Sequence, residues 1–297
     1  MFHWLNLLSI GNLVFHFAMA YPALGNGFKK IVTIVGCRSM RHTMTIPPEN
    51  RLVGLSSEDV LIVSFPKTGS TFTRFVFANV VHLLNKNSEP VDFYNLGQIM
   101  PECLKDNLIE FCWKGDPLPR LVKTHQLAED NPLYAQPKAL YVLRDPRDTM
   151  ISFYYYASKR KKGRYEGTFD EFIEHSTFGI DAYNKHIESW YSKASWVFDY
   201  ETLMQDPLAS FLRVFDDLGI KIQRELVQKA LLFSQPDKLK AAERENSRPN
   251  HSVNFDEDFT FVRNASVAQW KEKMSPEQAT YIWDRSSAIL KARYERD

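Results

Sequence analysis

Residues 64–74 read SFPKTGSTFTR, and this stretch decides the fold. The apolar, β-branched run that leads into it is typical of a buried strand and predicts one over Leu61–Phe65. The run that follows, STFTRFVFANVVHLL, predicts a helix over Ser70–Leu84. A strand, a tight turn and a helix in this order indicate an α/β fold.

The turn between this strand and this helix has the composition of an anion-binding loop. Exposed amide N–H groups at a helix start attract an anion, and the helix dipole adds to the effect. Lys67 supplies a positive charge, and Thr68, Ser70 and Thr71 supply hydroxyl donors. The stretch is not a Walker A motif, because Gly69 is its one glycine and the lysine precedes it. The alternative is an ordinary turn in which a serine caps the helix.

Three further short apolar runs are predicted to be strands. They are RLVKTH (120–125), ALYVLRD (139–145) and SWVFDYE (195–201). The segment after the third run, DPLASFLRVFDDLGI, predicts a helix with Asp206 as N-cap, Pro207 in the first turn and Gly219 at the C-terminal end. Strands separated by helices predict an α/β domain with a central, mostly parallel sheet flanked by helices. We expect this domain over 46–297, with a last helix over 275–295 and a polar loop over 247–260.

The N-terminal segment, 1–45, differs from the rest of the chain. Residues 1–28 carry no charged side chain, and WLNLLSIGNLVFHFAMAYPAL is apolar. Three interpretations stay open: a membrane-associated helix with the following lysines and arginines on the cytoplasmic side, a cleaved signal peptide, or an apolar helix packed on the domain. The three cysteines form no metal-binding spacing and predict reduced thiols, as in a cytoplasmic protein. The net charge of +1 gives no global attraction to nucleic acid.

Chemistry-bearing residues follow two of the other strands. Ligands of such sheets bind outside the carboxyl ends of the strands. Arg144 ends the run ALYVLRD, and Ser152 lies eight residues later in the next predicted helix. The pair could bind a second phosphate, or the arginine could form a local ion pair with a neighbouring aspartate. Lys123 and His125 end the run RLVKTH, and a histidine there suits a general base near neutral pH, although a structural histidine is the more common case.

Taken together, SFPKTGSTF, KTH and R-x7-S, each at a strand end, resemble the signature of the sulfotransferases of the cytosolic type. These enzymes use 3′-phosphoadenosine 5′-phosphosulfate (PAPS) as sulfuryl donor. FDYETLMQDP (198–207) and FVRNASVAQWK (261–271) resemble further segments of that family, so the similarity covers about residues 54–275. The resemblance implies a sulfotransferase fold related to P-loop kinases, PAPS as co-substrate with adenosine 3′,5′-bisphosphate (PAP) as product, and no metal.

The resemblance also implies roles for individual residues. The catalytic residues would be His125 as base, with Lys67, Lys123 and Ser152. The residues that hold the donor would be Lys67, Thr68, Gly69, Ser70, Thr71, Phe72, Arg144, Ser152, Tyr200, Ser234, Arg263, Asn264 and Ala265. Phe72 stands where the family usually has a tryptophan over the adenine. Asn264 and Ala265 replace a lysine and a glycine of the family's C-terminal loop, which removes a charge and some backbone freedom.

The function predicted is therefore in-line sulfuryl transfer from PAPS to a hydroxyl or amine of a small-molecule acceptor. We expect a cytoplasmic enzyme, with membrane contact through residues 1–28 as an open question, no nucleic-acid partner and an undetermined oligomeric state. No motif names the acceptor, whose pocket we expect near 92–103 and 247–260. Two alternatives are a P-loop kinase and a catalytically weak nucleotide-binding relative that serves as a partner protein.

Overall fold

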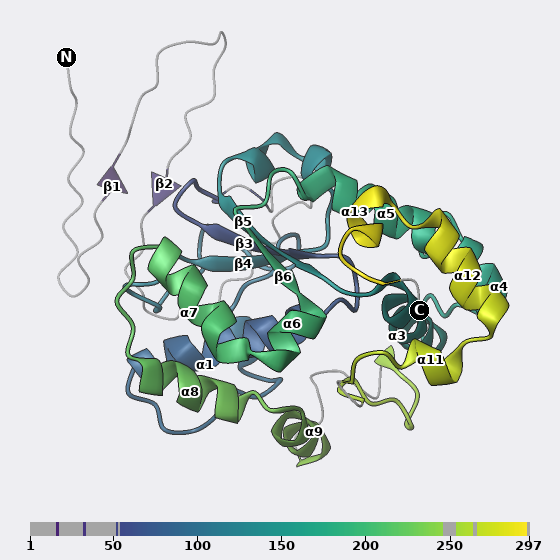
Figure 1. The fold of residues 1–297 in the computed structure, drawn as a ribbon. Helices are drawn as coiled ribbons and strands as arrows, with labels where there is room; N and C mark the ends of the chain where they lie inside the picture. The colour runs from purple at the N-terminus through teal and green to yellow at the C-terminus, as the bar shows by residue number, and fades with distance from the viewer. Residues whose placement is uncertain are drawn as a thin grey trace, which may run out of the picture. The chain divides into compact units, whose positions relative to one another are not determined.

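The computed structural model of the chain describes residues 16–17, 32–33, 52, 54–245, 254–263 and 266–295 (Figure 1). The chain divides into two units, Met1–Thr45 and Ile46–Asp297. In the first, β1 (His16–Phe17) pairs antiparallel with β2 (Val32–Thr33), so these positions are extended and the predicted N-terminal helix does not include them. The rest of the apolar stretch lies outside the described residues. None of the described helices is long and apolar enough to cross a membrane.

The second unit is built on a four-stranded sheet in which every neighbouring pair is parallel, as predicted. Its strands are β3 (Val60–Ser64), β4 (Leu121–Thr124), β5 (Lys138–Leu143) and β6 (Trp196–Asp199), in the order β4-β3-β5-β6. All four end at the same edge, so the residues that follow them meet there.

Alternating residues of each strand pack into two separate cores. Ile62 and Val142 face a core completed by α1 (Ser70–Leu84), α7 (Pro207–Asp217) and α8 (Arg224–Phe233). Leu61 and Tyr141 face a core completed by α3 (Pro146–Ser158), α4 (Phe169–Glu174), α5 (Ile180–Trp190) and α12 (Pro276–Arg285). All four side chains are fully buried. Figure 1 shows these two helix layers on opposite sides of the sheet. The near-continuous apolar character of the strands is explained by this burial on both faces.

The helices α1 (Ser70–Leu84) and α7 (Pro207–Asp217) begin where the sequence predicts. Asp206 caps α7 through its side chain, which accepts a hydrogen bond from the Ala209 amide at 3.1 Å, and Gly219 follows with φ 72°. The other helices and 3-10 turns are α2 (Leu96–Ile99), η2 (Ala128–Asp130), η3 (Pro132–Ala135), α3 (Pro146–Ser158), α4 (Phe169–Glu174), α5 (Ile180–Trp190), α6 (Tyr200–Gln205), α8 (Arg224–Phe233), α9 (Pro236–Glu245), α11 (Trp270–Lys273), α12 (Pro276–Arg285) and α13 (Ala288–Lys291).

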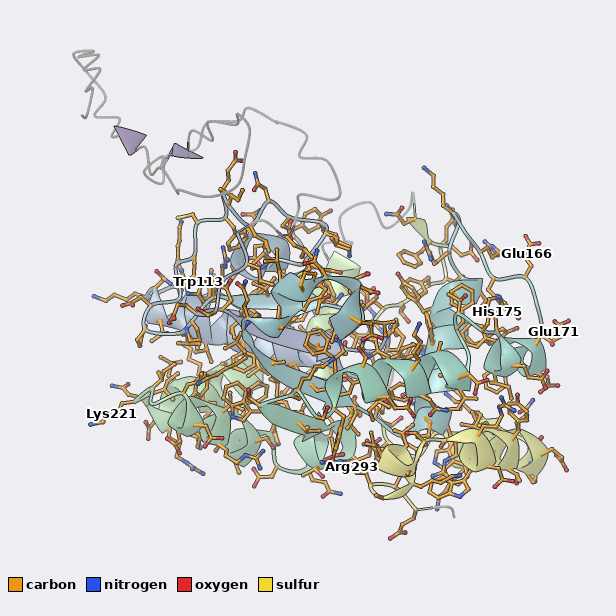
Figure 2. The ribbon with its side chains drawn as sticks, turned by 90° about the horizontal axis from the view of Figure 1, so that it is seen from above. Trp113, Glu166, Glu171, His175, Lys221 and Arg293 are labelled. Atoms are coloured by element: carbon orange, nitrogen blue, oxygen red, sulfur yellow. The ribbon has the colours of Figure 1, made fainter. Side chains whose placement is uncertain are left out.

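The C-terminal segment differs from the single helix predicted over 275–295. α12 ends at Arg285 and α13 begins at Ala288, because Ser286 is extended at the end of the first helix. Arg293, labelled in Figure 2, follows α13. Its guanidinium pairs with Asp199 at the end of β6 and donates to the Tyr191 hydroxyl at 2.8 Å. The C-terminal segment is thereby tied to the sheet.

The loop between α3 and α4 carries a run of basic residues, 159–164. Its main chain bonds to part of the segment predicted as a polar loop, with the Lys161 amide 2.9 Å from the Asn254 oxygen. Lys159 and Arg164 form ion pairs with Asp258 and Asp256. Two of the basic side chains are therefore neutralised locally.

The cysteines do not all match the prediction of reduced thiols. Cys103 is free and buried, and burial raises its pKa to about 12, so it remains a protonated thiol. Cys112 is disulfide-bonded, so the prediction is wrong for this residue. The cysteine-based argument for a cytoplasmic location is therefore lost.

Candidate active site

The loop between β3 and α1 has an unusual backbone. Lys67 adopts φ 72°, a left-handed conformation that non-glycine residues seldom occupy, and Gly69 adopts φ 114°. Thr68 lies between them, and its hydroxyl donates to the carbonyl oxygens of Phe65 at 3.0 Å and Val142 at 2.8 Å. The bond to Val142 attaches the loop to β5, and the bond to Phe65 lies within the loop. Strained backbone held in this way is typical of functional sites.

Gly69 is required by a close approach as well as by its φ angle. A Cβ atom at this position would lie 2.5 Å from Cδ2 of Tyr200, which is too close for any side chain. The loop can therefore pass directly against the Tyr200 ring only because residue 69 is a glycine.

The N-terminus of α1 opens into the cavity that this loop borders. Ser70 and Thr71, the first two residues of α1, line that cavity together with Gly69. The first turn of this fully described helix carries no acidic side chain. The free amide groups and the positive end of a 15-residue helix therefore favour an anion at this point.

Arg144 follows β5 and lies at the same end of the cavity. Its Nη2 donates to Asp148 Oδ2 at 3.1 Å and to the Ser266 oxygen at 2.8 Å, and its guanidinium lies 4.6 Å from the centre of the Tyr200 ring. Its Nε is buried and has no hydrogen-bond partner among the described residues. The ion pair with Asp148 is therefore present, and Arg144 also lines the cavity, while its role in phosphate binding stays a prediction. Ser152, one turn further along α3 than Asp148, also lines the cavity.

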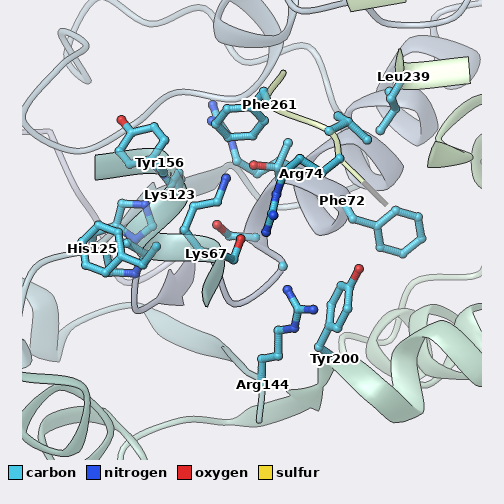
Figure 3. Close-up of a pocket in the computed structure, with 18 of the residues that line it drawn as sticks. Lys67, Phe72, Arg74, Lys123, His125, Arg144, Tyr156, Tyr200, Leu239 and Phe261 are labelled. Carbon is cyan, nitrogen blue, oxygen red and sulfur yellow. The ribbon is translucent and has the colours of Figure 1, made fainter. Parts of the chain in front are cut away.

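Lys123 and His125 lie at the end of β4, on the other side of the cavity from Arg144 (Figure 3). Residues two apart in a strand face the same side, which places both side chains toward the cavity. Lys123 Nζ lies 2.9 Å from Glu102 Oε1. Burial lowers the pKa of Lys123 to about 7, against the raising effect of the Glu102 charge. The pKa of Glu102 is about 2, because the charges of Lys123, Lys105 and Arg74 together outweigh the raising effect of burial.

The protonation state of His125 follows from its hydrogen bonds. Its Nδ1 lies 2.5 Å from the Ser64 carbonyl oxygen, which can only accept, so Nδ1 carries the proton. The other nitrogen, Nε2, then holds a lone pair. Burial lowers the pKa of His125 well below its ordinary value, and the positive charge of Lys123 lowers it further. His125 is therefore neutral at pH 7 and able to accept a proton.

These residues surround one cavity of about 390 Å³. It is lined by Pro66, Lys67, Gly69, Ser70, Thr71, Phe72, Arg74, Phe93, Leu96, Glu102, Lys105, Lys123, His125, Arg144, Ser152, Phe153, Tyr156, Arg160, Tyr200, Met204, Pro236, Leu239, Phe261, Val262, Arg263 and Gln269. Lys67 Nζ lies 3.9 Å from the centre of the Phe261 ring and 5.2 Å from that of Tyr156. Eleven of the predicted site residues therefore meet in one place.

Two predicted residues have other surroundings. Ser234 is buried outside the cavity, where its hydroxyl accepts from Asn79 Nδ2 at 3.0 Å and donates to the Ala230 oxygen at 2.8 Å. Thr68 does not line the cavity, because both of its hydroxyl bonds hold the loop to its neighbours. Asn264 and Ala265 lie outside the described residues, while Arg263 lines the cavity with its guanidinium 4.5 Å from the Tyr155 ring centre.

Several lining residues were missed by the sequence reasoning. Arg74 is the one Asp, Glu, Lys or Arg residue of α1, but nothing in the sequence indicated that it lines the cavity. Phe93, Leu96 and Glu102 confirm that part of 92–103 borders the site. Of the other expected loop, 247–253 lie outside the described residues, and none of the described residues 254–260 lines the cavity, whereas 261–263 do.

A parallel sheet with a helix N-terminus and a lysine-bearing loop at its carboxyl edge, facing a second lysine and a neutral histidine, is the arrangement expected of an enzyme that transfers a group from an anionic donor. Comparison with known families makes this specific. The sulfotransferase domain matches residues 57–288, so the chain belongs to the sulfotransferase family and is a sulfotransferase. This membership decides against the P-loop kinase alternative.

Curated relatives agree with this assignment. The chain is 27% identical over 244 residues to Sulfotransferase 2A2 of Rattus norvegicus, covering 76% of this chain and 81% of the relative. It is 27% identical over 238 residues to Sulfotransferase 1E1 of Homo sapiens, covering 72% of this chain and 77% of the relative.

Solved structures show the same fold. A structure of retinol dehydratase with androsterone and inactive cofactor PAP aligns with a TM-score of 0.61 and 18% identity, covering 79% of this chain and 81% of that one. A structure of mouse sulfotransferase SULT7A1 complexed with PAP aligns with a TM-score of 0.56 and 19% identity, covering 82% and 91%. The predicted sulfotransferase fold is confirmed.

Proposed function

We propose that this sulfotransferase moves the sulfuryl group of PAPS to a hydroxyl or amine of a small, largely apolar acceptor, with His125 as general base. The observation that carries the proposal is that Lys67, Lys123, His125, Arg144 and Ser152 line one cavity, although they come from four separate elements. No cluster of His, Cys, Asp or Glu that could hold a metal occurs among the described residues.

The donor end of the cavity fits a nucleotide that carries two anionic groups. The free amides at the start of α1 and the Lys67 side chain suit the 5′-phosphosulfate. Arg144, Ser152 and Arg263 line this end of the cavity, and two guanidinium groups with a hydroxyl suit the 3′-phosphate. Phe72 and Tyr200 line the same end and offer aromatic surfaces to the adenine. The retinol dehydratase and SULT7A1 structures both contain PAP, which supports a donor of this class.

The chemistry then divides among three side chains. His125 Nε2 takes the proton from the acceptor hydroxyl as its oxygen attacks sulfur, and the bond from sulfur to the bridging oxygen breaks. Lys67 stabilises the negative charge that develops on the bridging oxygen of the PAP product. Lys123 stabilises the sulfuryl oxygens during transfer. The proton on His125 passes to solvent after the sulfated product leaves.

The acceptor end of the cavity is mainly aromatic and aliphatic. Phe93, Leu96, Phe153, Tyr156 and Phe261 line it beside His125 and Lys123. Such a lining suits an apolar body with one reactive polar group. Relatives of this chain include a 3-alpha-hydroxysteroid sulfotransferase of Cavia porcellus and an amine sulfotransferase of Oryctolagus cuniculus, in agreement with a small-molecule acceptor.

The test is a screen of phenols, hydroxysteroids and arylamines with PAPS, repeated with H125A. We expect transfer to at least one acceptor class, and a loss of kcat of roughly 10²- to 10⁴-fold in H125A with PAP affinity retained. H82A is the matched control, because His82 lies near the end of α1 and outside the cavity. Activity in H125A equal to that of H82A would remove His125 as the base, and no transfer to any acceptor by the unmodified enzyme would contradict the proposed function.

A further inference from the structure

Glu102 carries the opposite charge to the other charged residues of the cavity. Among the described lining residues it is the one carboxylate, and the cations that share the cavity are Lys67, Arg74, Lys105, Lys123, Arg144, Arg160 and Arg263. Its side chain is 13% exposed. A carboxylate in a site built for anions is unfavourable to substrate binding unless it performs a task there.

The main chain places Glu102 beside Lys123. The Lys123 amide donates to the Pro101 oxygen at 2.9 Å, and the Cys103 amide donates to the Lys123 oxygen at 2.8 Å. These bonds form a parallel bridge that pairs Glu102 with Lys123 along the free edge of β4. Paired residues in neighbouring strands project to the same side, so both side chains face the cavity.

The Glu102 side chain joins the surrounding cations into one network. Its Oε1 accepts from Lys123 Nζ at 2.9 Å and lies 2.8 Å from Lys105 Nζ, and its Oε2 lies 3.7 Å from Arg74 Nη1. Arg74 is itself held from α1 by a 2.7 Å bond from its Nη2 to the Met100 oxygen. The Lys123 and Arg74 side chains are 10% and 12% exposed, whereas Lys105 is 69% exposed. The contact with Lys123 is therefore the best shielded from solvent.

We propose that Glu102 is a positioning residue, which holds the Lys123 ammonium in place and in its charged form at the acceptor end of the site. This inference rests on the proposed function, because it assigns Lys123 to the transferring sulfuryl group. The four-carbon stem of a lysine is flexible, so its ammonium can reach many positions. A hydrogen bond to Glu102, whose main chain is held by the β-bridge, restricts the Lys123 ammonium to one of these positions.

The charges that face Lys123 determine in which direction its pKa moves when the Glu102 charge is removed. Burial lowers the pKa of Lys123, and Arg74 of α1 and Lys105 of the 101–107 segment lower it further, while Glu102 alone among its principal neighbours raises it. His125, two residues along β4, is neutral by its own lowered pKa. With its pKa near 7, Lys123 is charged below pH 7 and loses its charge as the pH rises. Removing the Glu102 charge must therefore lower the pKa of Lys123 and narrow the pH range in which it is charged.

The experiment compares E102Q, E102D and the unmodified enzyme. The pKa of Lys123 is measured by NMR of ¹³Cε-labelled lysine, which needs no turnover, and kcat/KM with PAPS is measured against pH. In E102Q we expect the pKa of Lys123 and the alkaline limb of kcat/KM to move down by about one unit or more. Near pH 7.5 we expect kcat/KM to fall by roughly 10- to 100-fold. E102D keeps the charge, so its alkaline limb should stay closer to that of the unmodified enzyme.

E110Q is the matched control, because Glu110 is exposed in the same segment and does not line the cavity. An unchanged pKa of Lys123 in E102Q, or an alkaline limb equal to that of E110Q, would overturn the role of Glu102. The NMR readout keeps this result separate from the proposed function, which fails only if the unmodified enzyme transfers no sulfuryl group.

Discussion

The donor end and the acceptor end of the cavity are built in different ways. The donor end takes most of its groups, such as Lys67 and Arg144, from chain that directly follows a strand. The acceptor end combines Glu102, Tyr156 and Phe261, which come from three segments far apart in the sequence and meet only in the folded chain. The donor end is thus fixed by local backbone geometry, whereas the acceptor end is fixed by tertiary packing and by side-chain charges.

If this difference is real, a change of local backbone at the donor end should have a large effect on nucleotide binding. G69A forces φ 114° on a residue with a side chain and brings a Cβ atom within 2.5 Å of the Tyr200 ring. We expect a strain of about 1–3 kcal/mol and a PAP Kd raised by roughly 10- to 100-fold in calorimetry.

The control for G69A is G97A, since a Cβ atom at the exposed Gly97 meets nothing within 4 Å. A PAP Kd in G69A equal to that of G97A would show that the close approach of the loop to Tyr200 does not matter for the donor end.

A smaller effect should come from Phe72, which contributes surface rather than geometry to the donor end. Its ring lies 6.4 Å from that of Phe211 and lines the cavity. F72W enlarges the aromatic face, and we expect PAP to bind about two- to fivefold more tightly. The same measurement on F233W, at a position outside the cavity, provides the control. Weaker PAP binding in F72W, with PAP binding unchanged in F233W, would mean that the pocket is shaped to the smaller phenylalanine ring.

The sequence predicted the donor end because its signals are local. The apolar run before Lys67, the single glycine and the helix from Ser70 all lie within one continuous stretch, and the structure has that helix over the predicted residues. Strand ends were predictable to within a residue or two, so Arg144 and His125 could be assigned to one edge. Ser234 was assigned by resemblance alone, and its bonds to Asn79 and Ala230 depend on the packing of α1 against α8.

The acceptor end could not be predicted to the same degree. The bridge between Glu102 and Lys123 is formed by irregular chain at the free edge of β4, and no periodicity indicates it. Arg74 lies on a helix that otherwise carries no Asp, Glu, Lys or Arg, and nothing in the sequence of that helix indicates its contact with Glu102. The break between α12 and α13 likewise has no proline or glycine to mark it.

The central claim is that the cavity binds a nucleotide with a 3′-phosphate, and calorimetry with PAP and ATP tests it most directly. We predict that PAP binds more tightly than ATP. In R144Q we expect the Kd for PAP to rise by roughly 10- to 100-fold and the Kd for ATP to change little, because the proposed partner of Arg144 is the 3′-phosphate, which ATP lacks. The control R213Q removes an exposed arginine of α7 that does not line the cavity, and should leave both affinities unchanged. Tighter binding of ATP than of PAP, or equal PAP affinity in R144Q and R213Q, would contradict the account.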